Sequence, residues 1–333
     1  MSGAATGWAL GELEAAAAIV HEVFAPTPAI AWPLLAARCG TDVVVKHENH
    51  LPTGAFKVRG GLLYTRELAA REPAVHTLVA ATRGNHGQSV AFAARRAGLA
   101  ARIVVPHGNS ATKNAAMRAY GATLVEHGRD FQEALEHARE LGRAPGHHFV
   151  PSFQRTLVAG VASWALELFA QAGPLDRLYV PIGLGSGICG AIAVRDALGL
   201  ATGIVGVVAE KAPSYALSFA QGEPVEAAPA DTLADGLAVR LPDADALAVI
   251  RRGAERVVTV GEDEIRAAMR HYFTDTHNVA EGAGAAPLAA LLQERGGARD
   301  PRERAGARDP RVGLVLTGGN VDAALYAEVL QAG

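Results

Sequence analysis

The chain has 333 residues, half of them hydrophobic, and a formal net charge of −3. This length suffices for two domains with separate cores, and the near balance of charges without a long basic block excludes the usual electrostatic signature of a nucleic-acid partner. Cys39 and Cys189 lie far apart without a Cys/His cluster and no apolar run is long enough for a membrane span, so we expect no disulfide framework, no metal, no membrane and a reducing, cytoplasmic location.

Short apolar β-branched runs alternate along the chain with alanine-rich stretches of helical period. The runs predict strands at 42–46, 77–81, 101–105, 122–125, 177–182, 203–208, 256–260 and 312–317. Between them the pattern predicts helices such as 88–97, 111–120, 130–141, 157–172 and 187–198. This alternation is typical of βα units. We therefore expect an open α/β fold with ligands at the carboxyl ends of parallel strands.

Two smaller features accompany this alternation. The segment GARDPR occurs at 297–302 and again at 306–311, which predicts a solvated loop between a helix and the last strand. Among the aromatic side chains, Trp164 and Phe273 are predicted to lie in the core and His47 at the surface or in a loop.

Three glycine-rich loops follow predicted strands, namely ATRGNHGQS (81–89), PIGLGSGICG (181–190) and LTGGNVD (316–322). Glycine backbones and helix N-termini expose N–H groups that bind anions, so the middle loop is a candidate phosphate site. Its GxGxxG spacing at 185–190, with Glu210 after a second strand, also matches a dinucleotide fingerprint. An NAD-binding oxidoreductase is therefore one alternative.

The stretch LPTGAFKVRGG (51–61) places Lys57 between a Thr-Gly-Ala turn and a Gly-Gly pair. A lysine at a helix start is ordinarily a solvated residue, and a dinucleotide site would leave this loop unexplained. A lysine that forms an imine must instead lose its proton near neutral pH, which burial promotes by disfavouring the ammonium. Small neighbours would let a flat ring approach the backbone.

In chain order, these segments resemble the fold-type-II pyridoxal-phosphate enzymes and, among them, the serine/threonine dehydratases. KHENHLPTGAFKVRGG (46–61) resembles the cofactor-attachment signature, and RGNHGQS resembles the family's Ser-x-Gly-Asn-His-x-Gln loop. GLGSG (183–187) stands where the family has a tetraglycine loop, with two glycines replaced at unchanged length. EGAGAA (281–286) and TGGNVD (317–322) stand where it has Glu-x-Ala-Gly and Ser-Gly-Gly-Asn. The resemblance covers most of the chain.

The resemblance implies a role for each matched residue. Lys57 is expected to bind pyridoxal 5'-phosphate as an imine and to remove the substrate's Cα proton. Further expected cofactor-binding residues are Phe56 against the ring, Asn85 at its 3′-oxygen, Gly183, Leu184, Gly185, Ser186 and Gly187 around the phosphate, and Thr317 beside the pyridine nitrogen. Expected substrate-binding residues are Thr82, Arg83, Gly84, His86, Ser152 and Glu281. Because a hydroxyl does not hold the ring nitrogen protonated, elimination should compete well with transamination.

The resemblance also implies an architecture and an activity. We expect a large cofactor domain (1–70 and 152–333), an inserted smaller α/β domain (71–151), the fold of the tryptophan synthase β type, and a homodimer. The expected reaction converts a β-hydroxy-α-amino acid into a 2-oxo acid and ammonia, with threonine, serine, phenylserine and hydroxyaspartate as candidate substrates. A non-catalytic metabolite-binding protein is the second alternative, against which the retained Lys57 argues.

Two departures from the family pattern refine this expectation. Arg83 stands where close relatives have a small residue or serine, and relatives that racemise use that serine as a second base. A guanidinium stays protonated, so we expect little racemisation and a substrate with an anionic or aromatic side chain. EKAPSYA (210–216) lacks the second carboxylate of the cation site found in some relatives, so we expect no such ion.

Overall fold

The computed structural model describes residues 7–296 and 310–332. The strands are β1 (Ala29–Ala31), β2 (Asp42–His47), β3 (Thr77–Ala81), β4 (Ala100–Val105), β5 (Ala122–Glu126), β6 (His147–Phe149), β7 (Arg177–Pro181), β8 (Gly203–Ala209), β9 (Arg256–Val260) and β10 (Arg311–Leu316). The helices are α1 (Leu10–His21), α2 (Pro33–Cys39), α3 (Lys57–Arg71), α4 (Asn85–Arg96), α5 (Ala111–Ala119), α6 (Phe131–Leu141), α7 (Arg155–Ala172), α8 (Ser186–Ala197), α9 (Ser214–Gln221), α10 (Ala244–Gly253), α11 (Glu262–Thr276), α12 (Gly282–Gly296) and α13 (Ala323–Gln331), with short 3-10 helices η1 (Glu48–His50) and η2 (Asp235–Leu237).

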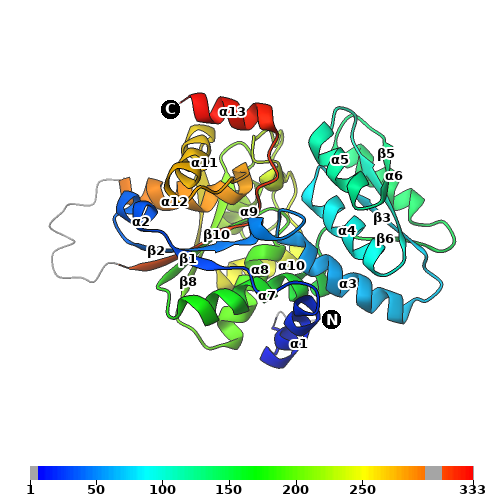
Figure 1. Ribbon diagram of the computed structural model, residues 1–333, viewed down its shortest axis with the longest axis horizontal. Coiled ribbons are helices and arrows are strands. Elements are labelled where there is room, and N and C mark those ends of the chain that lie inside the picture. Colours follow the sequence, from blue (N-terminus) through cyan, green and yellow to red (C-terminus); the bar gives the residue numbers. More distant parts are fainter. Residues whose placement is uncertain (1–6, 297–309, 333) are drawn as a thin grey trace.

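The strands form two separate sheets, which lie side by side in Figure 1. The larger sheet has the order β1-β2-β10-β7-β8-β9 and the smaller one β5-β4-β3-β6. Neighbouring strands are parallel throughout except for the antiparallel pair of β1 and β2. The predicted open α/β class is therefore confirmed, and the smaller sheet falls within the predicted inserted domain.

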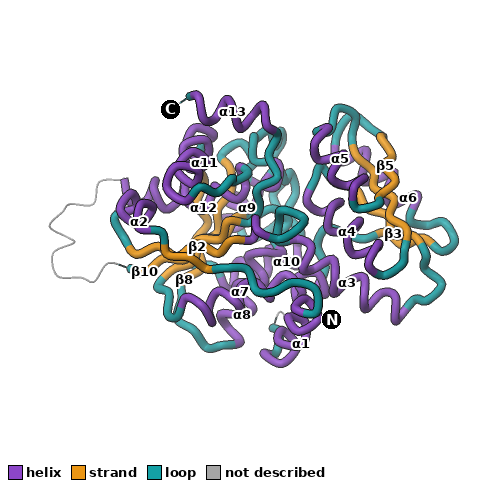
Figure 2. The backbone as a smooth tube through the Cα atoms, viewed as in Figure 1, coloured by secondary structure: helices purple, strands orange, loops and turns teal. Residues whose placement is uncertain are grey.

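Helices cover both faces of each sheet, as Figure 2 shows. One face of the larger sheet packs its apolar side chains against α1, α7, α8 and α10, and the other against α2, α11, α12 and α13. The smaller sheet packs against α3, α4 and α5 on one face and against α6 on the other. None of the helices within the described ranges is long and apolar enough to cross a bilayer.

Helices α3 and α7 approach each other through glycines. A Cβ atom added to Gly60 would lie 2.6 Å from the carbonyl oxygen of Leu157, and one added to Gly160 would lie 2.6 Å from the carbonyl oxygen of Arg59. Backbone atoms of the two helices are thus in direct contact. This contact fixes the first turn of α3, where Lys57 lies.

Some local predictions differ from the structure. The three-residue strands β1 and β6 were not predicted because they are too short to show a period. Phe273 is 39 % exposed at the edge of the Tyr326 ring, so its core prediction is wrong. His47 is buried, and its Nε2 accepts a hydrogen bond from Trp32 at 2.9 Å, so its surface prediction is also wrong. Residues 297–302 and 306–309 of the duplication lie outside the described residues.

Candidate active site

Lys57 is the first residue of α3, and its Nζ lies 5.3 Å from the centroid of the Phe56 ring. Its carbonyl oxygen accepts a hydrogen bond from Oγ of Ser89 at 2.8 Å. The side chain keeps some solvent contact, but the protein surrounds the amine, and this burial lowers the pKa of Lys57 to about 8 against the opposing charge of Glu281. At pH 7 such an amine is neutral in roughly one molecule in ten, against fewer than about one in a thousand for an ordinary lysine.

The segment before Lys57 contacts two other predicted site segments. The backbone N–H of Phe56 donates to the carbonyl oxygen of Thr317 at 3.0 Å, and Ala55 and Gly318 form an isolated bridge. Thr317 is buried directly after β10. A Cβ added to Gly187 would lie 3.5 Å from the Phe56 ring, which therefore packs against the first turn of α8. The structure thus brings the lysine loop, the last strand and the predicted phosphate loop together.

The predicted phosphate loop runs from the end of β7 to the start of α8 at Ser186. Gly185 is the N-cap with φ of +106°, and an added Cβ would lie 2.7 Å from Cβ of Ala246, so glycine is required there. The Tyr215 hydroxyl donates to the carbonyl oxygen of Leu184 at 2.9 Å and fixes the loop from behind. The first N–H groups of a helix have no partner within the helix, so the first turn of α8 can offer its N–H groups to an anion such as the predicted phosphate.

Asn85 and Glu281 form a hydrogen-bonded pair next to the lysine loop. Asn85 Nδ2 donates to Oε1 of Glu281 at 2.7 Å, while its Oδ1 accepts from Nδ2 of Asn320 at 2.8 Å. Burial raises the pKa of Glu281 to about 7, although the charge of Lys113 and the bond from Asn85 oppose the rise. Glu281 is therefore able to hold or release a proton near neutral pH.

The loop after β3 leads into α4 and buries most of its side chains, with Arg83 as the exposed exception. The Thr82 hydroxyl accepts from the backbone N–H of Gly84 at 2.9 Å, and both Thr82 and His86 are buried. Burial and the nearby Lys57 charge lower the pKa of His86 to about 4 against the influence of the Val150 backbone, so His86 is neutral. Within the described part of the chain its Nε2 has no hydrogen-bond partner, which leaves a buried polar atom for a ligand.

Two predicted substrate-binding residues lie at the rim. Ser152 is half-buried in the link between β6 and α7. Arg83 is exposed, and its Nη1 lies 3.7 Å from Oδ1 of Asp235 on η2. Lys113 on α5 donates to Oδ2 of the same carboxylate at 2.5 Å. Neither Lys113 nor Asp235 was predicted as a site residue, because each is a single charge in a segment without a motif.

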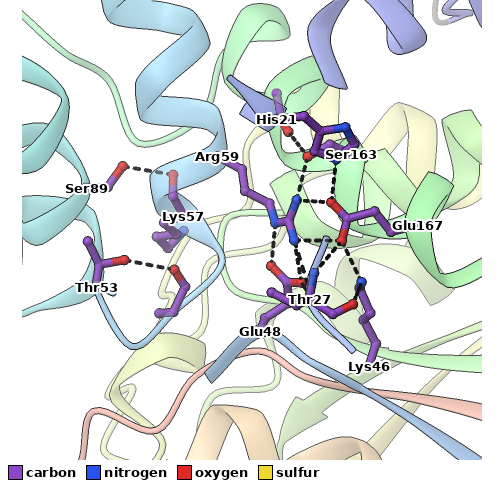
Figure 3. A network of polar contacts seen from close by, with 12 residues as sticks. His21, Thr27, Lys46, Glu48, Thr53, Lys57, Arg59, Ser89, Ser163 and Glu167 are labelled. Atoms are coloured by element: carbon purple, nitrogen blue, oxygen red, sulfur yellow. Dashed lines mark hydrogen bonds and ion pairs between the residues drawn. The ribbon is translucent and has the colours of Figure 1, made fainter. Parts of the chain in front are cut away.

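A buried polar network lies behind Lys57, centred on Arg59 two residues further along α3 (Figure 3). Arg59 is fully buried and donates to Oε2 of Glu48 at 2.6 Å and to Oε1 of Glu167 at 2.5 Å. Lys46, also fully buried, donates to Oε2 of Glu167 at 2.6 Å. His21, Thr27 and Ser163 complete the network. These bonds tie the start of α3 to β2, η1 and α7, so they hold the position of Lys57.

In the described ranges, no group of three or more His, Cys, Asp or Glu side chains is placed to hold a metal ion. Both cysteines are buried as free thiols. The site instead combines a surrounded amine of lowered pKa, that of Lys57, with the N-terminus of α8.

Comparisons with known proteins identify the same chemistry. A family profile described as "Pyridoxal-phosphate dependent enzyme" matches residues 20–318. L-threonine ammonia-lyase of Geobacter sulfurreducens is 36% identical over 298 residues, which cover 89% of this chain and 71% of that protein. L-threo-3-hydroxyaspartate ammonia-lyase of Pseudomonas sp. is 34% identical over 308 residues, covering 92% and 93%. A solved pyridoxal 5'-phosphate-dependent aspartate racemase is 28% identical with a TM-score of 0.86, covering 95% and 97%. The chain spans about half, 53%, of the length of the biosynthetic L-threonine dehydratases that it matches.

The site fits the cofactor that this family uses. The amine of Lys57 is partly neutral, the start of α8 offers backbone N–H groups to an anion, and His86 Nε2 is buried without a partner in the described part of the chain. The predicted fold, enzyme class and cofactor are confirmed, and the dinucleotide and non-catalytic alternatives are not favoured. The chain therefore belongs to the pyridoxal-phosphate-dependent enzyme family and, within it, to the fold-type-II serine/threonine dehydratases, the ammonia-lyases.

Proposed function

We propose that the protein converts a β-hydroxy-α-amino acid into a 2-oxo acid and ammonia by α,β-elimination. The observation that carries this proposal is the surrounded, low-pKa amine of Lys57 at the meeting point of the three strand-end loops. Relatives named as L-threonine and L-threo-3-hydroxyaspartate ammonia-lyases support it.

Pyridoxal phosphate, when bound, supplies an acceptor for the electron pair left behind when Cα loses its proton. The residues proposed to hold it are Phe56, Lys57, Asn85, the loop Gly183–Gly187 and Thr317. Phe56 offers a ring face, and the loop offers backbone N–H groups to the phosphate. The Thr317 hydroxyl offers a neutral partner to the pyridine nitrogen, which keeps the electron acceptor weak and favours loss of the β-hydroxyl.

Lys57 is the proposed general base. Its pKa of about 8 lets the neutral amine take the Cα proton at physiological pH and hold it as an ammonium. The charge of Glu281 favours that ammonium, so the carboxylate helps Lys57 to take and hold the proton removed from Cα.

The loop Thr82–His86 is the proposed site for the substrate α-carboxylate. The loop ends in the first turn of α4, whose N-terminus favours a carboxylate, and His86 stands in that turn as a neutral side chain. Ser152 and Glu281 are proposed to contact the substrate or the ring edge. Arg83 cannot remove a proton, so we propose elimination without inversion at Cα, with an anionic or aromatic substrate side chain.

The absorption spectrum of the purified protein tests whether Lys57 binds the cofactor as an imine. The protein should absorb as a lysine-bound pyridoxal phosphate, and borohydride should bleach the band and fix the cofactor mass on Lys57. Lys57→Ala should remove both signals, whereas Lys211→Ala, at an exposed lysine, should leave them unchanged. A colourless protein, or mass on another lysine, would contradict the assignment.

A substrate panel tests the reaction. L-serine, L-threonine, L-threo-3-hydroxyaspartate and phenylserine are incubated with the enzyme while 2-oxo acid and ammonia are measured. Equal amounts of both products from at least one substrate are expected, and no product from any of the four would refute elimination.

Three further expectations remain proposals supported by the resemblance. These are the domain boundaries at 1–70 with 152–333 and at 71–151, a homodimer, and a cytoplasmic location. Light scattering of the purified protein measures the mass of the assembly.

A further inference from the structure

Two cations meet one carboxylate beside the candidate active site. Lys113 on α5 donates from Nζ to Oδ2 of Asp235 at 2.5 Å, and Nη1 of Arg83 lies 3.7 Å from Oδ1 of the same residue. The Lys113 side chain is 10% exposed, whereas Arg83 is 49% and Asp235 36% exposed. The cluster thus joins a buried cation to an exposed one through a single carboxylate on η2.

This cluster adjoins the loop proposed to bind the substrate α-carboxylate. The stem of Lys113 runs along the backbone of Gly84, where an added Cβ would lie 3.0 Å from Cδ of the lysine. Lys113 also lies near the site's buried carboxyl, because its charge is the largest influence that opposes the rise in the pKa of Glu281. The side chain of an amino acid held by this loop would therefore start within reach of both cations.

The charges in the cluster are not balanced. In the buried network behind Lys57, the cations Lys46 and Arg59 face the two carboxylates of Glu48 and Glu167. At the rim, Arg83 and Lys113 pair with Asp235, and the other carboxyl near Lys113, that of Glu281, has its pKa raised by burial to about 7 and so carries only part of a negative charge at neutral pH. A surplus positive charge that reaches solvent attracts an anion, and a guanidinium and an ammonium both form strong charge-assisted hydrogen bonds to a carboxylate.

We propose that Arg83 and Lys113 form a subsite for a second carboxylate on the substrate side chain, and that Asp235 holds the two cations when no such carboxylate is present. This inference rests on the proposed function and narrows its substrate. The class it selects is a β-hydroxy-α-amino dicarboxylic acid, of which 3-hydroxyaspartate is the smallest. Asp235 is then a counter-ion that such a substrate displaces.

A purely structural reading makes a different prediction. If Asp235 served only to join the two halves of the molecule, its loss would weaken all amino-acid ligands alike. In the subsite reading, its loss frees both cations and strengthens binding of dicarboxylic ligands alone. The two readings are therefore separated by ligands that differ only in side-chain charge.

The experiment titrates the cofactor-loaded enzyme with L-aspartate and with L-asparagine, following the cofactor absorption band. Neither ligand has a β-hydroxyl to lose, and asparagine is the neutral counterpart of aspartate. The wild-type enzyme should bind aspartate about tenfold to a hundredfold more tightly than asparagine. Arg83→Met and Lys113→Met should each reduce this ratio at least about threefold, and Asp235→Asn should increase it.

Arg129→Met is the matched control, because Arg129 is an exposed cation of the same smaller domain that pairs with Glu133. It should leave the ratio unchanged. A wild-type ratio near one, or a ratio unaltered in both Arg83→Met and Lys113→Met, overturns the subsite. Elimination from serine is measured in the same preparation to separate the subsite from the proposed function. If 2-oxo acid forms from serine but aspartate and asparagine bind equally well, the subsite alone is refuted. A high ratio without elimination from any substrate refutes the proposed function alone.

Discussion

Replacing Arg59 by methionine should destabilise the protein by about 3–5 kcal/mol, the usual cost of removing one partner from a buried ion pair. The guanidinium is fully buried and bonds both Glu48 and Glu167, so its loss removes the cation that the two buried carboxylates share. Glu167 then keeps its bonds to Lys46 and His21, and Glu48 keeps its bond from the Thr27 hydroxyl. The pKa of Glu167 gives a second measure. Burial alone would raise it, but Arg59 and Lys46 outweigh burial and lower the pKa from 4.5 to about 2. That shift corresponds to about 3 kcal/mol of stability.

The same shift fixes the sign of a pH effect. A carboxylate whose pKa is depressed in the folded state adds stability above its unfolded pKa and loses it as the pH falls through the folded pKa. Glu167 should therefore contribute its stability fully above pH 4.5 and lose it progressively towards pH 2. In Arg59→Met the Glu167 pKa rises towards its ordinary value, so this acid dependence should flatten.

Urea unfolding at about pH 7 and at several values below about pH 5 measures both quantities. Arg129→Met, at an arginine that is 89% exposed and pairs with Glu133 four residues on, should leave the free energy of unfolding nearly unchanged, because solvent screens exposed ion pairs. Arg59→Lys keeps the charge but loses the planar donors, so an intermediate loss is expected. A loss below about 1 kcal/mol in Arg59→Met, or an unaltered acid dependence, would refute this account of the network.

Three further predictions concern the reacting groups. The rate of cofactor attachment should rise with pH through about 8, because only neutral Lys57 reacts. Glu281→Gln should lower the midpoint of this pH profile, because it removes a charge that favours the Lys57 ammonium. Stopped-flow absorbance measures the rate, and an unmoved midpoint would contradict the influence of Glu281 on Lys57. Thr317→Asp should protonate the pyridine nitrogen of the cofactor, alter the absorption spectrum and divert flux to side reactions. Thr317→Ser should change neither the spectrum nor the elimination rate appreciably. An unchanged spectrum with full elimination in Thr317→Asp would show that Thr317 does not contact the ring nitrogen. Chiral chromatography of unreacted L-serine should find little inversion by the wild-type enzyme and more by Arg83→Ser, and appreciable wild-type inversion would defeat the single-base argument.

The regular elements were predictable because β-branched runs and alanine-rich helices carry their own period. The strand-end loops were predictable as well, since parallel strands bring their carboxyl ends to one edge, and Phe56, Thr317 and Gly187 do meet there. Lys113 and Asp235 were not, because 122 positions separate them and only the tertiary fold joins them. A weak signal for the buried network exists, since Lys46 and Glu167 are charged residues within apolar runs. The periodic pattern does not show which of these charged residues form ion pairs with each other.

The glycine contact between α3 and α7 sets a limit on how this enzyme can vary. With backbone atoms of the two helices already touching at Gly60 and Gly160, no side-chain rearrangement makes room for an added methyl group. In a library of random variants these two positions should accept almost nothing but glycine, as a pair. The exposed position of Arg83 should accept many residues without loss of the fold, although such changes should alter which ligands bind. Substitutions that change the substrate should therefore accumulate in the loops around the site, and not in α3, the helix that begins with Lys57.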